Sequence, residues 1–120
     1  MKPVSVIYGD VILPWPPTGL SPNSRLHWAK IAKLKKAYRT ECWALCKASK
    51  LSAPTEGPVF LEILFIPPSK RKYDLDNCLA SIKAGLDGVA DAVQVDDSRF
   101  VLSIAKSQNI GGMVKITIRG

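Results

Sequence analysis

The stretch from Val59 to Ile66 constrains the fold most. It is an apolar run interrupted only by Glu62, with Pro58 directly before it and Pro67-Pro68 directly after it. A run of this length suits a buried strand and is short for a helix. Because proline cannot donate to a sheet ladder or continue a helix, both ends of the element are sharply fixed. The run therefore predicts a central strand of a β-sheet.

Periodicity and turn residues on either side predict the other elements. These are a first strand from Val4 to Leu13, a helix from Asn23 or Ser24 (as N-cap) to about Ser49, a second helix from about Leu75 to Ala92, a strand from Phe100 to Ser107, a hairpin-like turn at 109–112 and a strand over 114–118. The order β-α-β-α-β-β predicts an α+β fold with a mixed sheet and two helices. With 120 residues, we expect a single domain over 1–120.

Charge and cysteine content restrict the partners and the compartment. Seventeen Lys and Arg against ten Asp and Glu give a net charge of +7, which is typical of a chain that binds a polyanion, most often nucleic acid. Three cysteines cannot form a complete disulfide framework, so we expect a reducing, cytoplasmic setting. No stretch approaches the ~20 apolar residues of a membrane span, so we expect no membrane association.

Acidic residues gather in one part of this basic chain. Six of the ten acids fall between 74 and 97, namely Asp74, Asp76, Asp87, Asp91, Asp96 and Asp97. Carboxylates repel phosphate, so a protein that only coats DNA has no use for them. They could bridge a divalent metal to phosphate, or they could form salt bridges with the protein's own lysines.

Asp74 and Asp76 form the densest part of this acidic group. In an extended segment, residues two apart point the same way, with backbones about 7 Å apart, so both carboxylates can reach one ion. Few, hard oxygen ligands suit Mg²⁺. The alternative is that Asp76 caps the second helix and Asp74 is solvated. If the neighbouring strands pair, Asp97 can come beside the two, and Lys83 lies on the same helix side as Asp76.

Four motifs together resemble the RusA-type Holliday junction resolvases. They are Leu-Pro-Trp-Pro-Pro at 13–17, Asn23 followed by basic residues, Asp-Leu-Asp-Asn at 74–77, and Asp-Asp-Ser at 96–98. The resemblance implies a RusA-like fold and a homodimer that cuts four-way junction DNA symmetrically with Mg²⁺, for which Mn²⁺ can substitute, and with no small-molecule cofactor. It also implies that Asp74, Asp76 and Asp97 are catalytic metal ligands, with Asp96 as the alternative to Asp97. The family's lysine position holds Ala80 here, and we infer that Lys83 replaces it.

Basic residues near these motifs are candidates for DNA contacts. We expect Lys70, Arg71 and Lys72 to position the DNA backbone, together with Asn23 and Arg25. We expect His27 to cap the first helix or to lie on the surface rather than to bind metal, and we expect Cys42 and Cys46 to be buried apolar residues. Trp28 and Trp43 are predicted to pack along the first helix.

Two other functions fit parts of the pattern. A catalytically silent DNA-binding protein of the same fold is favoured by Ala80 and opposed by the clustered acids. An RNA-binding α/β module is a weaker alternative, because the chain lacks the aromatic-rich strand on which such modules stack bases.

Overall fold

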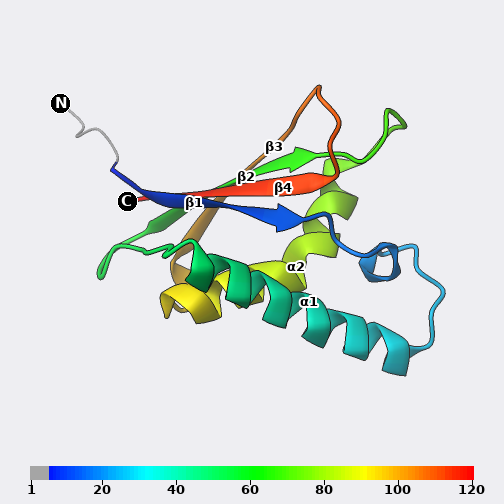
Figure 1. Cartoon of the computed structure of the whole chain (residues 1–120), viewed down its shortest axis with the longest axis horizontal. Helices are drawn as coiled ribbons and strands as arrows, with labels where there is room; N and C mark the ends of the chain where they lie inside the picture. The colour runs from blue at the N-terminus through cyan, green and yellow to red at the C-terminus, as the bar shows by residue number, and fades with distance from the viewer. Residues whose placement is uncertain (1–5) are drawn as a thin grey trace.

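The computed structural model describes residues 6–120 and shows two helices and a four-stranded sheet (Figure 1). The elements are β1 (Ile7–Pro14), the 3₁₀ turn η1 (Thr18–Leu20), α1 (Trp28–Ala48), β2 (Val59–Ile66), α2 (Leu75–Val93), the 3₁₀ turn η2 (Asp97–Arg99), β3 (Phe100–Lys106) and β4 (Met113–Arg119). The predicted β-α-β-α-β-β order is confirmed. The predicted start of the first strand, Val4, lies outside the described residues.

The sheet is mixed, and its strand order is β1-β4-β2-β3. β4 pairs antiparallel with both β1 and β2, whereas β2 and β3 run parallel and are connected through α2. Both helices lie against the same face of the sheet (Figure 1). Among residues 6–120, no helix is long and apolar enough to span a membrane.

β2 occupies a central position, as its apolar sequence predicts, but this placement overturns the predicted hairpin at 109–112. β3 and β4 do not pair, because β2 lies between them. The connecting segment instead passes the end of β2, where Ser107 N donates to Phe65 O at 2.8 Å and Gly112 N donates to Ile66 O at 3.0 Å. The local turn signal was outweighed by the need of a largely buried strand for a partner on each side.

The core lies between the inner sheet face and the two helices. It contains Val59, Leu61, Ile63 and Phe65 of β2, Val114, Ile116 and Ile118 of β4, Tyr38, Cys42 and Cys46 of α1, and Ile82, Leu86 and Val89 of α2. Burial raises the pKa of the Cys42 thiol to about 12 and that of Cys46 to about 11, so both are protonated at neutral pH. The prediction that these cysteines are buried apolar residues is confirmed.

α1 begins later than predicted. Ser21 to Ser24 form a separate turn, in which Ser24 N donates to Ser21 O at 2.9 Å. His27 is the N-cap, and its Nδ1 accepts from Ala29 N at 3.2 Å, so the capping interpretation of His27 is confirmed. The next residue, Trp28, is 75% exposed, and the prediction that it packs along the helix is wrong.

Candidate functional site

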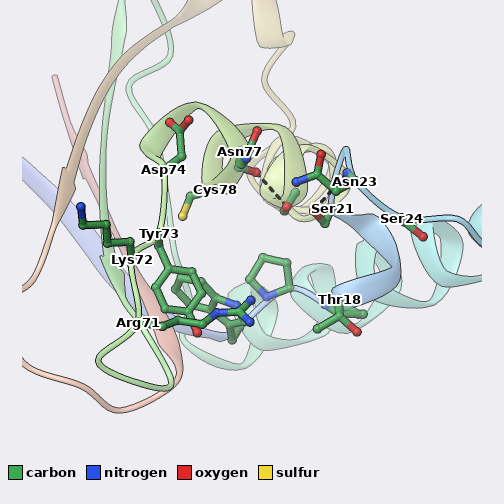
Figure 2. A pocket seen from close by; sticks show the side chains of 14 residues that line it. Thr18, Ser21, Asn23, Ser24, Arg71, Lys72, Tyr73, Asp74, Asn77 and Cys78 are labelled. Carbon is green, nitrogen blue, oxygen red and sulfur yellow. Dashed lines mark hydrogen bonds between the residues drawn. The ribbon is translucent and has the colours of Figure 1, made fainter.

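A hollow of about 350 Å³ lies where the proline-rich loop after β1 meets the segment that leads into α2 (Figure 2). Its lining residues are Trp15, Pro16, Pro17, Thr18, Ser21, Asn23 and Ser24 from the loop, and Arg71, Lys72, Tyr73, Asp74, Asn77, Cys78 and Ser81 from the second segment. Two of the motifs that the sequence singled out, 13–17 and 74–77, therefore face one another across a single hollow.

The loop side of the hollow is held by contacts to the core. The Tyr38 hydroxyl donates to Pro14 O at 2.6 Å and ties the end of β1 to α1. Trp15 packs edge-on against Phe65, with ring centroids 6.1 Å apart, and against Tyr73 at 5.4 Å. The stiffness of consecutive prolines adds to these contacts, so the loop presents a fixed wall.

The opposite wall carries two carboxylates at the N-terminus of α2. Asp74 is the N-cap, and its Oδ1 accepts from Asp76 N at 3.0 Å. The alternative in which Asp76 caps the helix and Asp74 is solvated is wrong in its choice of residue, because Asp74 is the cap, although the helix does begin at this motif. Both residues are exposed, and the carboxylate of Asp74 stands at the rim of the hollow (Figure 2). The positive end of the helix dipole stabilises negative charge at this position.

Cations contact Tyr73, the residue directly before Asp74. The Arg71 guanidinium lies 5.1 Å from the centroid of the Tyr73 ring, and Lys106 Nζ donates to Tyr73 O at 3.0 Å. Sequence reasoning missed Lys106, which reaches this position because the parallel register sets it opposite Phe65 at the end of β2. Lys106 could have been identified from the sequence if β2 had been paired in parallel with the strand that follows α2.

The predicted DNA contacts fall into two groups. Asn23, Arg71 and Lys72 line the hollow. Lys70 and Arg25 are exposed but do not line it. The structure therefore brings residues from both predicted basic segments to the side of α2 where Asp74 lies.

Asp97 lies at the other end of α2 from Asp74 and Asp76. The helix has 19 residues and a length of about 28 Å. In the parallel pair, Asp74 follows the C-terminal end of β2, whereas Asp97 precedes the N-terminal end of β3. The expectation that the three carboxylates meet within one chain is therefore wrong. Over residues 6–120, no group of three or more His, Cys, Asp or Glu could hold a metal ion.

The surroundings of Asp97 are those of a polar surface turn. Asp96 caps η2, accepting from Ser98 N at 3.1 Å, and this hydrogen bond lowers the pKa of Asp96. Asp97 shares a shallow hollow with Arg39, Asp87 and Asp91.

Lys83 also lies away from the hollow of Asp74. It is exposed on α2 and lines a separate groove with Lys35, Lys36, Arg39 and Asp87, between the two helices. Ala80, at the position of the family lysine, is exposed one turn earlier. Lys106, rather than Lys83, is the lysine that directly contacts the segment entering α2.

Comparison with known proteins places the chain in a family. No family model matches it. A protein of Xylella fastidiosa (strain Temecula1 / ATCC 700964) is 42% identical over 116 residues, which cover 92% of this chain and 76% of that protein. The chain belongs to the same family as this Xylella protein. The relative's name, "Uncharacterized protein", states no activity, so inference about function rests on the site.

Proposed function

We propose that the chain is a RusA-type endonuclease that resolves four-way DNA junctions by paired, Mg²⁺-dependent hydrolysis of phosphodiesters. The observation that supports this most is the pair Asp74 and Asp76 at the start of α2, bordered by Arg71, Lys72 and Lys106. A cation-rich rim attracts DNA phosphate, whereas two carboxylates within it oppose phosphate unless a metal ion lies between them.

The residues at this end of α2 fit a magnesium ion. Mg²⁺ takes one or two carboxylates and keeps positions for water and substrate phosphate. Asp74 uses Oδ1 for the helix cap, which leaves Oδ2 available, and Asp76 is exposed beside it. When bound, such an ion lowers the pKa of a coordinated water and offsets charge on the scissile phosphate. Arg71 and Lys72 orient the DNA backbone, and Lys106 holds the segment that carries Asp74.

A role for Asp97 at the same ion requires a second copy of the chain. Within one chain, α2 separates Asp97 from Asp74 by its whole length. A two-fold homodimer, which suits paired cuts on symmetry-related strands, allows one subunit to supply Asp74 and Asp76 and the other to supply Asp97. We include this arrangement in the proposal in place of a site within one chain.

Cleavage of a synthetic four-way junction tests the proposal. We expect the wild-type protein to cut with Mg²⁺ and not with EDTA, and Asp74→Asn to abolish cutting while junction binding stays within about twofold. Asp10→Asn is the matched control, because Asp10 is an exposed carboxylate on β1, far from α2 in the fold. Near wild-type cutting by Asp74→Asn would exclude Asp74 from the site.

Mixing of inactive variants tests whether the site is shared. A heterodimer of Asp74→Asn and Asp97→Asn subunits contains one intact site if ligands come from both subunits, and none if each subunit uses only its own. We expect the mixture to recover single-strand nicking that neither variant shows alone. If Asp97→Asn alone cuts at the wild-type rate, Asp97 is not a ligand.

A silent DNA-binding protein is the second candidate, and one observation favours it. Ala80 leaves the exposed face of α2 next to Asp76 without the lysine that active family members carry. This candidate predicts junction binding that does not depend on Mg²⁺ and no cutting at any metal concentration.

A further inference from the structure

Trp28 has the most exposed large aromatic side chain among residues 6–120. It is 75% exposed, although tryptophan is highly buried on average in folded proteins. Its position is fixed by its neighbours, because Leu26 fills the space beside Gly19, where a Cβ would come 2.6 Å from Leu26 Cδ1, and His27 caps α1. The indole lies 5.3 Å from the His27 ring, with 35° between the two planes. The first residue of α1 therefore holds a broad aromatic face in water.

An exposed stripe runs along α1 from this residue. Because a helix turns once every 3.6 residues, positions 28, 35, 39 and 43 lie on one side of it. Trp43, at the far end, is 41% exposed and lies about 22 Å from Trp28 along the helix axis. The stripe thus has an aromatic side chain at each end and cations between them. Its members, all exposed, are Trp28, Ala32, Lys35, Lys36, Arg39 and Trp43.

The C-terminal half of this stripe borders a groove against α2. Two hollows, of about 440 and 410 Å³, lie between the helices, and Lys36 and Arg39 line both of them. They therefore form one groove, and Trp43 lines one end of it. The hollow of Asp74 is built from other residues. The residues that α2 contributes to the groove are Lys83, Ala84, Asp87 and Asp91.

The groove carries a surplus of two positive charges. Of its two acids, Asp91 is paired with Arg39, whose Nε lies 2.7 Å from Asp91 Oδ2. Asp87 then stands against three lysines, at 35, 36 and 83. Such a surplus attracts a polyanion. Lysines alone are typical of a solvated helix face, whereas the two tryptophans indicate a polyanion that also has planar, apolar surfaces.

We propose that the stripe and its groove bind a single-stranded segment of DNA. Unpaired bases stack on the two indoles, and the lysines between them contact the phosphates. A positively charged groove with aromatic side chains suits a single strand, because every base has a planar face on which it can stack. In a duplex these faces are covered by the neighbouring base pairs, so the tryptophans favour unpaired DNA over duplex DNA.

The stripe begins close in sequence to the hollow of Asp74. Ser24, which lines that hollow, precedes Trp28 by four residues in the loop that enters α1. A strand that leaves the hollow along this loop reaches Trp28 first. The stripe would therefore select branched DNA with unpaired bases next to the cut. This consequence rests on the proposed function, whereas the binding of a single strand does not.

Binding of labelled oligonucleotides in EDTA, where metal-dependent cutting cannot occur, tests the stripe. The probe is an oligothymidylate of about 20 nucleotides, longer than the ~16 that a single-strand site covers, and a duplex of the same length is the comparison. Because the stacking of one base is lost, we expect Trp28→Ala to raise the dissociation constant for oligothymidylate at least about fivefold and that for duplex less than about twofold. Trp28→Phe keeps an aromatic face and should stay within about threefold of wild type.

Phe60→Ala is the matched control for the loss of an aromatic side chain. Phe60 is 37% exposed and lies on the sheet face that the helices leave uncovered, since its neighbours in β2 point into the core. We expect this variant to bind both probes as the wild type does. Circular dichroism establishes that each variant is folded.

The salt dependence of binding tests the lysines separately. Each phosphate contact contributes about 0.7 to the slope of log affinity against log salt for a single strand. Lys35→Ala is expected to lower the slope for oligothymidylate by about this amount. Lys115→Ala is the control, because Lys115 lies on the uncovered sheet face, 4.0 Å from Asp10, and we expect its slope to equal that of the wild type.

Each outcome bears on the stripe separately from the nuclease. A wild-type protein that does not bind oligothymidylate at micromolar concentration, or a Trp28→Ala protein that binds it as tightly as the wild type, would overturn the proposal. Single-strand binding that depends on Trp28 in a protein that cuts no junction supports the stripe and counts against the proposed activity. Junction cutting by a protein whose single-strand affinity does not depend on Trp28 does the reverse.

Discussion

Gly88→Ala is predicted to destabilise the protein, although it places a better helix former in the middle of α2. The two helices approach closely at this point. A Cβ on Gly88 would overlap the carbonyl oxygen of Arg39 and lie 3.0 Å from Trp43 N and 3.2 Å from Arg39 C. All of these atoms belong to the backbone of α1, so no side-chain rotation relieves the overlap and the helix itself must move.

The sign of the stability change follows from two opposing contributions. Replacing glycine by alanine within a helix gains up to about 1 kcal/mol from propensity. Overpacking a core contact costs about 1–3 kcal/mol, and the cost lies at the upper end when backbone must shift, because separated helices lose dispersion contacts along their interface. We expect a net loss of about 1–2 kcal/mol and a fall in Tm of roughly 3–8 °C.

Thermal and urea unfolding measure this change. Ala80→Gly is the control, because Ala80 is exposed on the same helix and its loss of up to about 1 kcal/mol reports propensity without packing. A higher Tm for Gly88→Ala would refute the close approach of α1 and α2 at this residue, because propensity would then act unopposed.

Three further changes probe the site and its supports. Asp74→Ala should lose about 1 kcal/mol of stability by removing the cap of α2, whereas Asp74→Asn should lose less because asparagine caps equally well; equal losses in thermal unfolding would contradict the cap. Tyr38→Phe leaves Pro14 O without its donor and should lower the free energy of unfolding in urea by about 1–2 kcal/mol. An unchanged free energy of unfolding would refute this hydrogen bond. The Arg39 guanidinium, 2.7 Å from Asp91, lowers the pKa of that carboxyl below its ordinary 3.8, so the ion pair stabilises the fold above pH 3.8 and is lost as the pH falls through the lowered pKa. Asp91→Asn should therefore differ slightly from wild type at pH 7 and match it in strong acid, and a difference that persists there would point to another cause.

The elements of the fold could be predicted because their signals are local. The apolar run at 59–66, with prolines at both ends, and the alternation at 114–118 predict two strands, and both appear where expected. The helix start was less predictable, since Asn23 and Ser24 are favourable caps in isolation. In the structure they belong to a turn of their own, and the following loop delays α1 until His27 caps it.

Strand partners could not be read from the sequence in the same way. The glycine pair at 111–112 suggests a tight turn between neighbouring strands, and the chain does turn there. Which strand lies alongside depends instead on the pairing of the whole sheet. β4 and β2 take the two interior positions, and β3 lies at the edge.

The same difference between local signals and whole-sheet pairing decides which parts of the candidate site could be predicted. Asp74 and Asp76 are two residues apart, so both lie at the start of α2, and the hydrogen bond from Asp76 N to Asp74 Oδ1 is a matter of local geometry. The extended segment expected to turn both carboxylates the same way is absent, because Asp76 already belongs to the helix. The positions of Asp97 and Lys106 depend on the direction of β3. Because β3 runs parallel to β2, its last residue, Lys106, lies beside the start of α2. Asp97, which precedes β3, lies at the opposite end of α2. An antiparallel β3 would have exchanged these two positions, with Asp97 beside Asp74.

The direction of β3 therefore ties the catalytic proposal to assembly. A parallel β3 removes Asp97 from the site of its own chain, so the proposed site takes this carboxylate from a second copy. If this proposal holds, dilution below the dissociation constant of the dimer must abolish cleavage, whereas Asp74→Asn must abolish cleavage without changing the mass in solution.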